Sequence, residues 1–261
     1  MSDDQPMSFL EHLEELRWRL LRAAVAVVIF ASIIWIYQRE IMEGVFLNMV
    51  DPNFISFRLL CEYLGVCVDQ INVDFQSTTL SGQFSYALMM SIMGGVVLAF
   101  PYIFYQLWAF VKPGLKFQEK KMARGIVFYV SLLFFLGILF GYYVVAPLSV
   151  QFFGAFQITP EIKTDVTIAS YMSTVLSTVF YTGLFFLFPI VTFLLVKIGL
   201  FTPEFLIKYR KHAIVVILIL AAVITPPDVI SQVIVTIPIY LLFEISILVA
   251  KRVSKQEAEE K

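Results

Sequence analysis

The segment GIVFYVSLLFFLGILFGYYVVAPLSV, residues 125–150, contains no Asp, Glu, Lys or Arg. A helix needs about 20 apolar residues to cross the roughly 30 Å of hydrocarbon in a bilayer. The segment is long enough to do so, and residues 20–37, 86–111 and 171–196 form three further apolar runs of this kind. The sequence therefore predicts at least four membrane-spanning helices.

The composition of the whole chain agrees with a membrane protein. Of its 261 residues, 59% are hydrophobic and only 15% are charged, and the mean hydropathy is +0.84. Soluble domains carry about 25% charged residues, so lipid is the main solvent expected here. The net charge of -1 gives no support for a nucleic-acid partner.

Two more apolar runs lie at residues 213–224 and 229–250, separated only by Thr225-Pro226-Pro227-Asp228. Prolines cannot continue a helix, so the two runs form a hairpin of spans. The sequence thus predicts an all-α, polytopic integral membrane protein with six transmembrane helices and short fifth and sixth spans. The fifth is the shorter, at about 18 Å for its purely apolar part.

Lys and Arg in the connecting segments predict the orientation, because cytoplasmic loops are enriched in them. With the N-terminus inside, the inner segments hold 16 of the 19. Only Arg39, Arg58 and Lys163 fall outside. Both termini are therefore expected in the cytoplasm.

We expect one membrane domain over residues 1–261. Residues 1–19 form a cytoplasmic amphipathic helix, residues 38–85 an outer cap loop with short helices, and residues 252–261 a flexible cytoplasmic tail. Cys61 and Cys67 lie in the outer loop, where a local disulfide and two buried free thiols are both open interpretations. They are too few and too local for a structural zinc site, and no other metal cluster is indicated.

Polar residues within or beside the spans are candidates for function, since ionisable groups are costly in lipid. Glu244 lies inside the sixth span, Gln106 near the inner end of the second, and Gln232 near the outer end of the sixth. Together with Asp228, between the fifth and sixth runs, these residues predict a concave polar groove that contacts partners. Packing inside the bundle is the alternative for Glu244, and capping of the sixth helix is the alternative for Asp228.

Small residues and charges at helical spacing have structural interpretations as well. Gly137 and Gly141 are four residues apart, which permits close helix packing. Glu15 can pair with Arg19 at i,i+4 on a surface helix, a contact that needs no ligand.

Several short motifs occur in an order that resembles one known family, the TatC proteins of the twin-arginine translocase. The motifs are HLxELRxRL from His12, QxWxFxxPGL from Gln106, EKK from Glu119, FxYxVxxP from Phe140, RKxA from Arg210, TPPDxxSQ from Thr225 and PxxLLxEI from Pro238. Each motif is weak alone, but their joint order is specific. The resemblance covers nearly the whole chain, with the outer loop least matched.

The resemblance implies a core receptor that binds twin-arginine signal peptides of folded precursors at the cytoplasmic face of the inner membrane. It implies TatA- and TatB-like single-span partners, oligomerisation within the translocase, export driven by the proton-motive force, and neither enzyme activity nor a cofactor. Carried onto this chain, the recognising acids are Glu15 and Glu119, with Arg17 and Arg19 in the same N-terminal motif. Planar guanidinium groups and fixed carboxylates suit each other for bidentate hydrogen bonding.

One position departs from the family pattern. The family carries a glutamate just before a proline in the fourth span, where this chain has Leu187 before Phe188 and Pro189. The corresponding polar contact with a partner helix is therefore expected from Thr182, Ser177 or Glu244.

A small-solute secondary transporter is the main alternative. Such a protein places ionisable groups near the bilayer midplane, and Glu244 is the residue that favours it. A membrane scaffold without cargo recognition is a third possibility.

Overall fold

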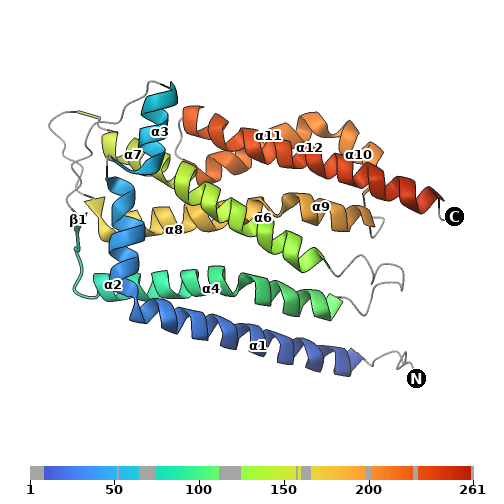
Figure 1. Ribbon diagram of the computed structural model, residues 1–261, viewed down its shortest axis with the longest axis horizontal. Helices are drawn as coiled ribbons and strands as arrows, with labels where there is room; N and C mark the ends of the chain where they lie inside the picture. The colour runs from blue at the N-terminus through green and yellow to red at the C-terminus, as the bar shows by residue number, and fades with distance from the viewer. Residues whose placement is uncertain are drawn as a thin grey trace. The chain divides into compact units, whose positions relative to one another are not determined.

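The computed structural model describes residues 9–51, 53–64, 75–111, 125–156, 158–159, 166–197, 201–225 and 229–259. These residues are almost entirely helical (Figure 1). The chain forms two compact units, residues 1–38 with 87–132 and residues 39–86 with 133–261.

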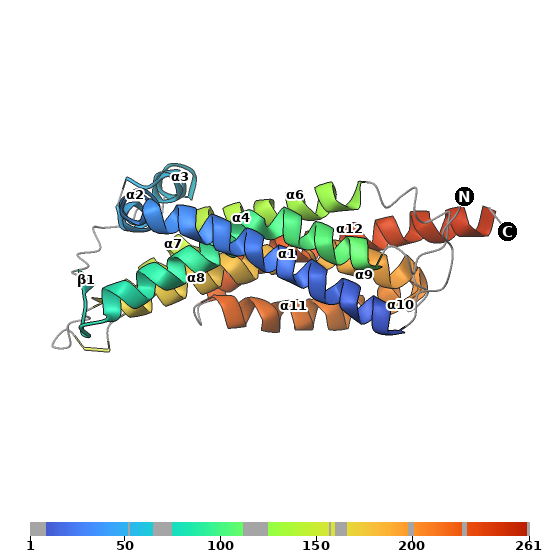
Figure 2. The ribbon, with the colours of Figure 1, turned by 90° about the horizontal axis from the view of Figure 1, so that it is seen from below.

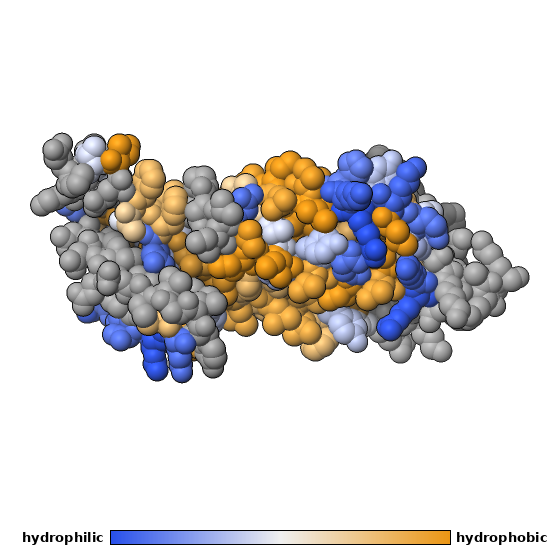
Figure 3. Space-filling view, turned by 90° about the horizontal axis from the view of Figure 1, so that it is seen from above, coloured by the Kyte–Doolittle hydropathy of each residue, from blue (hydrophilic) through white to orange (hydrophobic). Residues whose placement is uncertain are grey.

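Five helical segments have the length and apolar composition needed to cross a membrane: Leu10–Ile36, Gly82–Val111, Ile126–Ala155, Ile168–Val196 and Ser231–Arg252. These segments match the first, second, third, fourth and sixth predicted spans. Hydrophobic residues fill the middle of the face drawn in Figure 3, and hydrophilic residues gather toward its ends. This distribution is the one expected of helices that cross hydrocarbon.

The first unit contains α1 (Phe9–Ile36) and most of α4 (Gly82–Val111). A Cβ atom added to Gly95 of α4 would lie 2.8 Å from the backbone nitrogen of Ala31 in α1. Glycine therefore lets the two helix backbones approach closely. The predicted surface helix and first span form one uninterrupted helix, because no proline or glycine interrupts residues 9–36.

The segment predicted as an outer cap loop with short helices does contain short helices. These are α2 (Gln38–Ile41), the π-helical turn η1 (Met42–Phe46), the 3₁₀ turn η2 (Leu47–Val50) and α3 (Ile55–Leu64). Cys61 in α3 is disulfide-bonded. Cys67 lies outside the described residues, so its part in the predicted pair stays a prediction.

The second unit holds most of the third span and all of the fourth. The third span runs through α6 (Ile126–Phe140), whose first residues belong to the first unit, the π-helical turn η4 (Gly141–Val145) and α7 (Ala146–Ala155). The fourth is α8 (Ile168–Phe185) and α9 (Phe188–Lys197), interrupted at residues 186–187. Pro189 explains the interruption, because proline removes a backbone hydrogen bond and clashes with the preceding turn.

A short parallel β-pair and two threonine caps organise the ends of these helices. In the pair, β1 (Phe75–Gln76) lies beside β2 (Val166–Thr167). The Thr167 hydroxyl then accepts a hydrogen bond from the Ser170 amide and starts α8. Thr202 caps α10 (Pro203–Lys208) in the same way.

The C-terminal hairpin consists of α11 (Arg210–Ile224) and α12 (Val229–Glu259). The two helices are in contact, and Figure 2 shows α11 in orange and the C-terminal end of α12 in red. At 15 residues, α11 is about 22 Å long, so the predicted fifth span is indeed short. The sixth, at 22 residues, is the shortest of the five candidate spans but long enough to cross.

α12 also continues beyond its span, into the segment predicted as a flexible tail. The helix runs through Glu259 because residues 251–259 contain no proline or glycine to end it. Residues 260–261 lie outside the described part of the chain.

The third and fourth spans make the close approach predicted from Gly137 and Gly141. A Cβ atom on Gly137 would lie 2.8 Å from the Cα atom of Gly183 in α8, and one on Gly141 would lie 3.0 Å from the Cα atom of Val179. Small residues thus bring the helix backbones into direct contact.

Replacing Gly137 by valine is expected to destabilise this unit, because the new side chain meets the backbone of α8. Overpacking of this kind costs about 1–3 kcal/mol. The midpoint of thermal unfolding in detergent should fall. Gly44→Val is the matched control, since nothing lies within 4 Å of a Cβ at that exposed glycine. An equal fall in both variants would contradict the packing account.

Candidate functional site

Three residues predicted as functional lie together in the first unit. The Arg19 Nε atom donates to Glu15 Oε1 at 2.9 Å, one turn away on α1. The Arg19 Nη1 atom donates to Gln106 Oε1 of α4 at 3.5 Å. Gln106 is buried, with 4% of its surface exposed. The i,i+4 pair predicted on a surface helix therefore forms, and it is part of a network between two helices.

The second carboxylate oxygen of Glu15 is a different case. Glu15 Oε2 is buried and has no hydrogen-bond donor among the described residues. A buried ionised oxygen without a donor costs free energy, so such atoms are usually satisfied in proteins. The N–H of Trp108, two residues beyond Gln106 on α4, likewise lacks an acceptor among these residues. The first unit thus contains a charged acceptor, Glu15 Oε2, and a donor, the Trp108 N–H, that have no described partners.

Arg17 does not join this network. Residues two apart on a helix do not face each other, so Arg17 points away from Glu15. Its guanidinium carbon lies 5.6 Å from the ring centroid of Trp18, in a cation–π contact on an exposed surface. The structure therefore separates Arg17 from Arg19, although both were predicted in one site.

His12 marks the end of the same helix pair. Its ring stacks on Phe110 of α4 with the centroids 4.2 Å apart. The contact continues the antiparallel alignment of α1 and α4 that Gly95 and Gln106 establish farther along. An aromatic stack holds the first turns of α1 against the end of α4 that carries Trp108.

Glu119 and Asp228 lie outside the described residues. The role of Glu119 in binding and the two interpretations of Asp228 therefore stay predictions.

A second polar cluster lies in the second unit around Glu244. The Arg210 Nη2 atom, at the start of α11, donates to Glu244 Oε2 at 2.7 Å. The Tyr240 hydroxyl, one turn earlier on α12, donates to Glu244 Oε1 at 2.9 Å. Both carboxylate oxygens thus have donors, which supports the alternative of packing inside the bundle for this residue.

Sequence reasoning missed the partners of Glu244. Arg210 was recognised only in a motif, and Tyr240 not at all. The spacing of Tyr240 and Glu244, one helical turn apart, was a usable signal. Arg210 lies 34 residues before Glu244 and had no local signal.

Gln232 makes a structural contact at the end of the hairpin opposite to Glu244. Its side-chain nitrogen donates to the backbone oxygen of Leu218, joining α12 to α11 at 3.1 Å. Gln232 and Glu244 are 12 residues apart on one helix, or about 18 Å along its axis. The structure does not bring them together, and the concave polar groove stays a prediction.

The residues expected to replace the family glutamate already have intramolecular partners. Leu187 lies in the turn between α8 and α9. Thr182 is fully buried and donates to the Thr178 backbone oxygen at 2.7 Å, and the Ser177 hydroxyl donates within its own helix. Glu244 has two donors, Arg210 and Tyr240.

Comparison with known proteins bears on this arrangement. A family model for the Sec-independent protein translocase protein TatC matches residues 11–238. The chain belongs to the TatC family. The match begins one residue before His12, the first residue of the HLxELRxRL motif, and ends at Pro238 in α12.

TatC relatives are similar over nearly the full length. A TatC from Blattabacterium sp. subsp. Periplaneta americana is 36% identical, with 98% of this chain and 99% of the relative covered. TatCy of Bacillus subtilis is 34% identical, with 94% and 89% covered. A crystal structure of the twin arginine translocase receptor TatC superposes with a TM-score of 0.69 at 32% identity, covering 93% of this chain and 99% of that one.

Membership in the TatC family makes this a translocase protein and not an enzyme, and its apolar helices make it a multi-pass membrane protein. Among the described residues, no group of three or more His, Cys, Asp or Glu is placed to hold a metal ion.

Removal of Arg210 is expected to destabilise the C-terminal hairpin. Arg210→Met leaves the Glu244 carboxylate with Tyr240 as its one described donor, and an uncompensated, partly buried charge is costly. The pair retains some exposure, so the expected loss is about 1–2 kcal/mol, measured as the unfolding midpoint in detergent.

The double variant Arg210→Met/Glu244→Gln should recover much of this loss, because no charge is then left unpaired. A double variant less stable than Arg210→Met would contradict the pairing.

Proposed function

We propose that this chain is the core receptor of a twin-arginine protein translocase. It binds twin-arginine signal peptides of folded precursors at the cytoplasmic face and assembles with TatA- and TatB-like single-span partners for export driven by the proton-motive force. The observation that carries the proposal is Glu15, held by Arg19 while its buried Oε2 atom has no described donor.

A guanidinium group suits this position for physical reasons. It stays charged at all relevant pH values, is planar, and presents parallel N–H donors that match a carboxylate. Lysine has a compact ammonium group that cannot present the same planar pair of parallel N–H donors. Arg19 already uses Glu15 Oε1, so in the proposal the ligand guanidinium donates to Oε2, which becomes accessible when neighbouring side chains shift on binding, and adds a second charge-assisted bond.

Fixing Glu15 before the ligand arrives reduces the entropy lost on binding. The Arg19 and Gln106 contacts hold the carboxylate against α4, so little side-chain ordering remains. In the proposal, Glu119 supplies the second carboxylate for the second arginine, and both acids lie on the cytoplasmic side by the Lys and Arg distribution.

The proposed topology is six spans with both termini in the cytoplasm, in the inner membrane. Its support is the concentration of 16 of 19 Lys and Arg residues on one side of the predicted loops. The fifth span uses α11 with the charged turn at Arg210, and local bilayer thinning accommodates its length.

The transporter alternative is not favoured. A midplane site needs an ionisable residue accessible to a solute, whereas both oxygens of Glu244 are bonded to Arg210 and Tyr240. The family relationship points the same way. A binding experiment distinguishes the proposed receptor from a scaffold that does not recognise cargo.

Binding of a fluorescent twin-arginine signal peptide to the purified chain in detergent tests the proposal. Glu15→Gln and Glu119→Gln should each weaken binding at least tenfold, since each removes a charge-assisted hydrogen bond worth about 1.5–3 kcal/mol. Anisotropy titration gives the dissociation constants.

Glu14→Gln is the matched control, because Glu14 is exposed on the same helix and its loss changes the net charge equally. Equal weakening by Glu14→Gln and Glu15→Gln would show a nonspecific charge effect. If Glu15→Gln and Glu119→Gln both bound the peptide as the wild type does, the receptor proposal would be contradicted and the scaffold interpretation would be favoured.

A further inference from the structure

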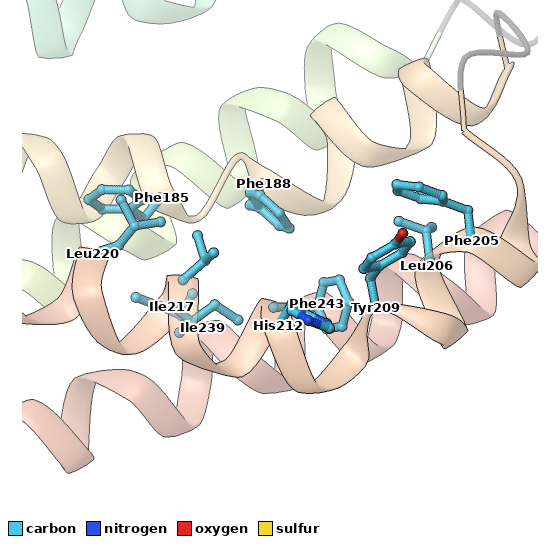
Figure 4. A pocket seen from close by; sticks show the side chains of 12 residues that line it. Phe185, Phe188, Phe205, Leu206, Tyr209, His212, Ile217, Leu220, Ile239 and Phe243 are labelled. Atoms are coloured by element: carbon cyan, nitrogen blue, oxygen red, sulfur yellow. The ribbon is translucent and has the colours of Figure 1, made fainter.

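An apolar pocket of about 280 Å³ lies within the second unit, lined by residues of α8 to α12 (Figure 4). Figure 4 shows Phe185 and Phe188 on one side of it and Ile217 and His212 of α11 on the other. Its lining has two parts. Buried residues form the floor and exposed residues form the rim; the floor includes Leu206, Ile217, Ile239 and Phe243, and the rim includes Phe205, Tyr209 and Val216.

The chemistry of the lining restricts the occupant. Apolar cavities of about 150 Å³ stay free of water and take up benzene-sized molecules. This pocket has nearly twice that volume and is lined almost wholly by carbon. The surrounding solvent of a membrane-spanning unit is hydrocarbon, so an alkyl chain enters without the cost of leaving water.

The volume of the pocket favours a chain over a helix. Partner helices pack along extended faces in which small residues allow close approach. Here the exposed rim carries the large aromatic rings of Phe205 and Tyr209, which contact each other with their centroids 4.5 Å apart. A pocket of about 280 Å³ takes up part of an alkyl chain but is too small for a helix about 10 Å wide.

A positive charge lies beside the rim. The Lys208 Nζ atom is 5.9 Å from the ring centroid of Tyr209, a lining residue. Lys208 and Lys211 are both exposed. Tyrosine and lysine at the edge of an apolar region are typical of the level of lipid headgroups, and basic pockets between helices bind anionic headgroups.

We propose that this pocket binds one acyl chain of an anionic phospholipid, with the lipid phosphate held at Lys208 beside Tyr209. The site goes beyond the proposed receptor function, because it shares no residue with the Glu15 cluster and lies in the other unit. The lipid fills the space between α9 and α11 and thereby supports the short fifth helix.

Native mass spectrometry of the delipidated full chain tests this site. The chain is titrated with phosphatidylglycerol or with phosphatidylcholine of the same acyl composition, and the first bound lipid is measured. The wild type should bind phosphatidylglycerol at least fivefold more tightly. Val216→Trp, which fills the pocket from its exposed rim, should weaken the binding of both lipids at least fivefold.

Val215→Trp is the matched control for bulk, because Val215 is equally exposed on α11 but does not line the pocket. Lys208→Gln should remove the preference for phosphatidylglycerol, whereas Lys251→Gln, an exposed lysine on α12, should keep it. Circular dichroism verifies that each variant is folded.

Three results would overturn the proposal. The first is equal binding of the two lipids by the wild type. The second is lipid binding unchanged by Val216→Trp relative to Val215→Trp. The third is a Val216→Trp variant that retains lipid but no longer co-purifies with a single-span membrane partner, which would identify a protein docking site.

Discussion

The hydrogen-bonding demand of the backbone in hydrocarbon is the constraint on which this structure depends. Bilayer lipid offers no partners for N–H and C=O groups, so each crossing segment satisfies them within a helix. Several Ser and Thr hydroxyl groups inside these helices follow the same rule and donate to the carbonyl one turn earlier. Examples are Ser91 to Ala87, Ser149 to Val145, Thr192 to Phe188 and Thr236 to Gln232. Such hydroxyls are satisfied locally and place no demand on neighbouring helices.

The charged side chains also make contacts between helices, and they define the two polar clusters. Around Glu244, both carboxylate oxygens have donors, which ties α11 to α12, while the Nε atom of Arg210 is buried without a described acceptor. Around Glu15, one oxygen is bonded to Arg19 and the other has no described donor. A carboxylate with donors on both oxygens contributes to stability, whereas a carboxylate with one oxygen left over has an acceptor for a ligand. This difference between two otherwise similar Glu–Arg pairs is the reason for assigning recognition to the first and packing to the second.

Sequence reasoning succeeded where a pattern is local. The apolar runs predicted the spans, the i,i+4 spacing predicted the Glu15–Arg19 pair, and Gly137 predicted the close approach to α8. It failed where the contact depends on tertiary packing. Gln106 joins Arg19 across 87 residues, and Arg210 reaches Glu244 across 34, distances at which one sequence carries no spacing signal. The apolar pocket was also unforeseen, because a cavity arises from how helices meet and not from the residues of any one of them.

A double-mutant cycle on signal-peptide binding tests the proposed recognition of arginine by Glu15 most directly. The cycle combines Glu15→Gln in this chain with replacement of the peptide arginine pair by lysines, and it yields the coupling free energy between the two changes. We predict a coupling of at least about 1 kcal/mol, because either single change removes the charge-assisted hydrogen bond between the guanidinium and Glu15 Oε2. The same cycle with Glu14→Gln should give additivity within about 0.3 kcal/mol. Additive effects at Glu15 would contradict direct recognition of the arginine pair by this carboxylate.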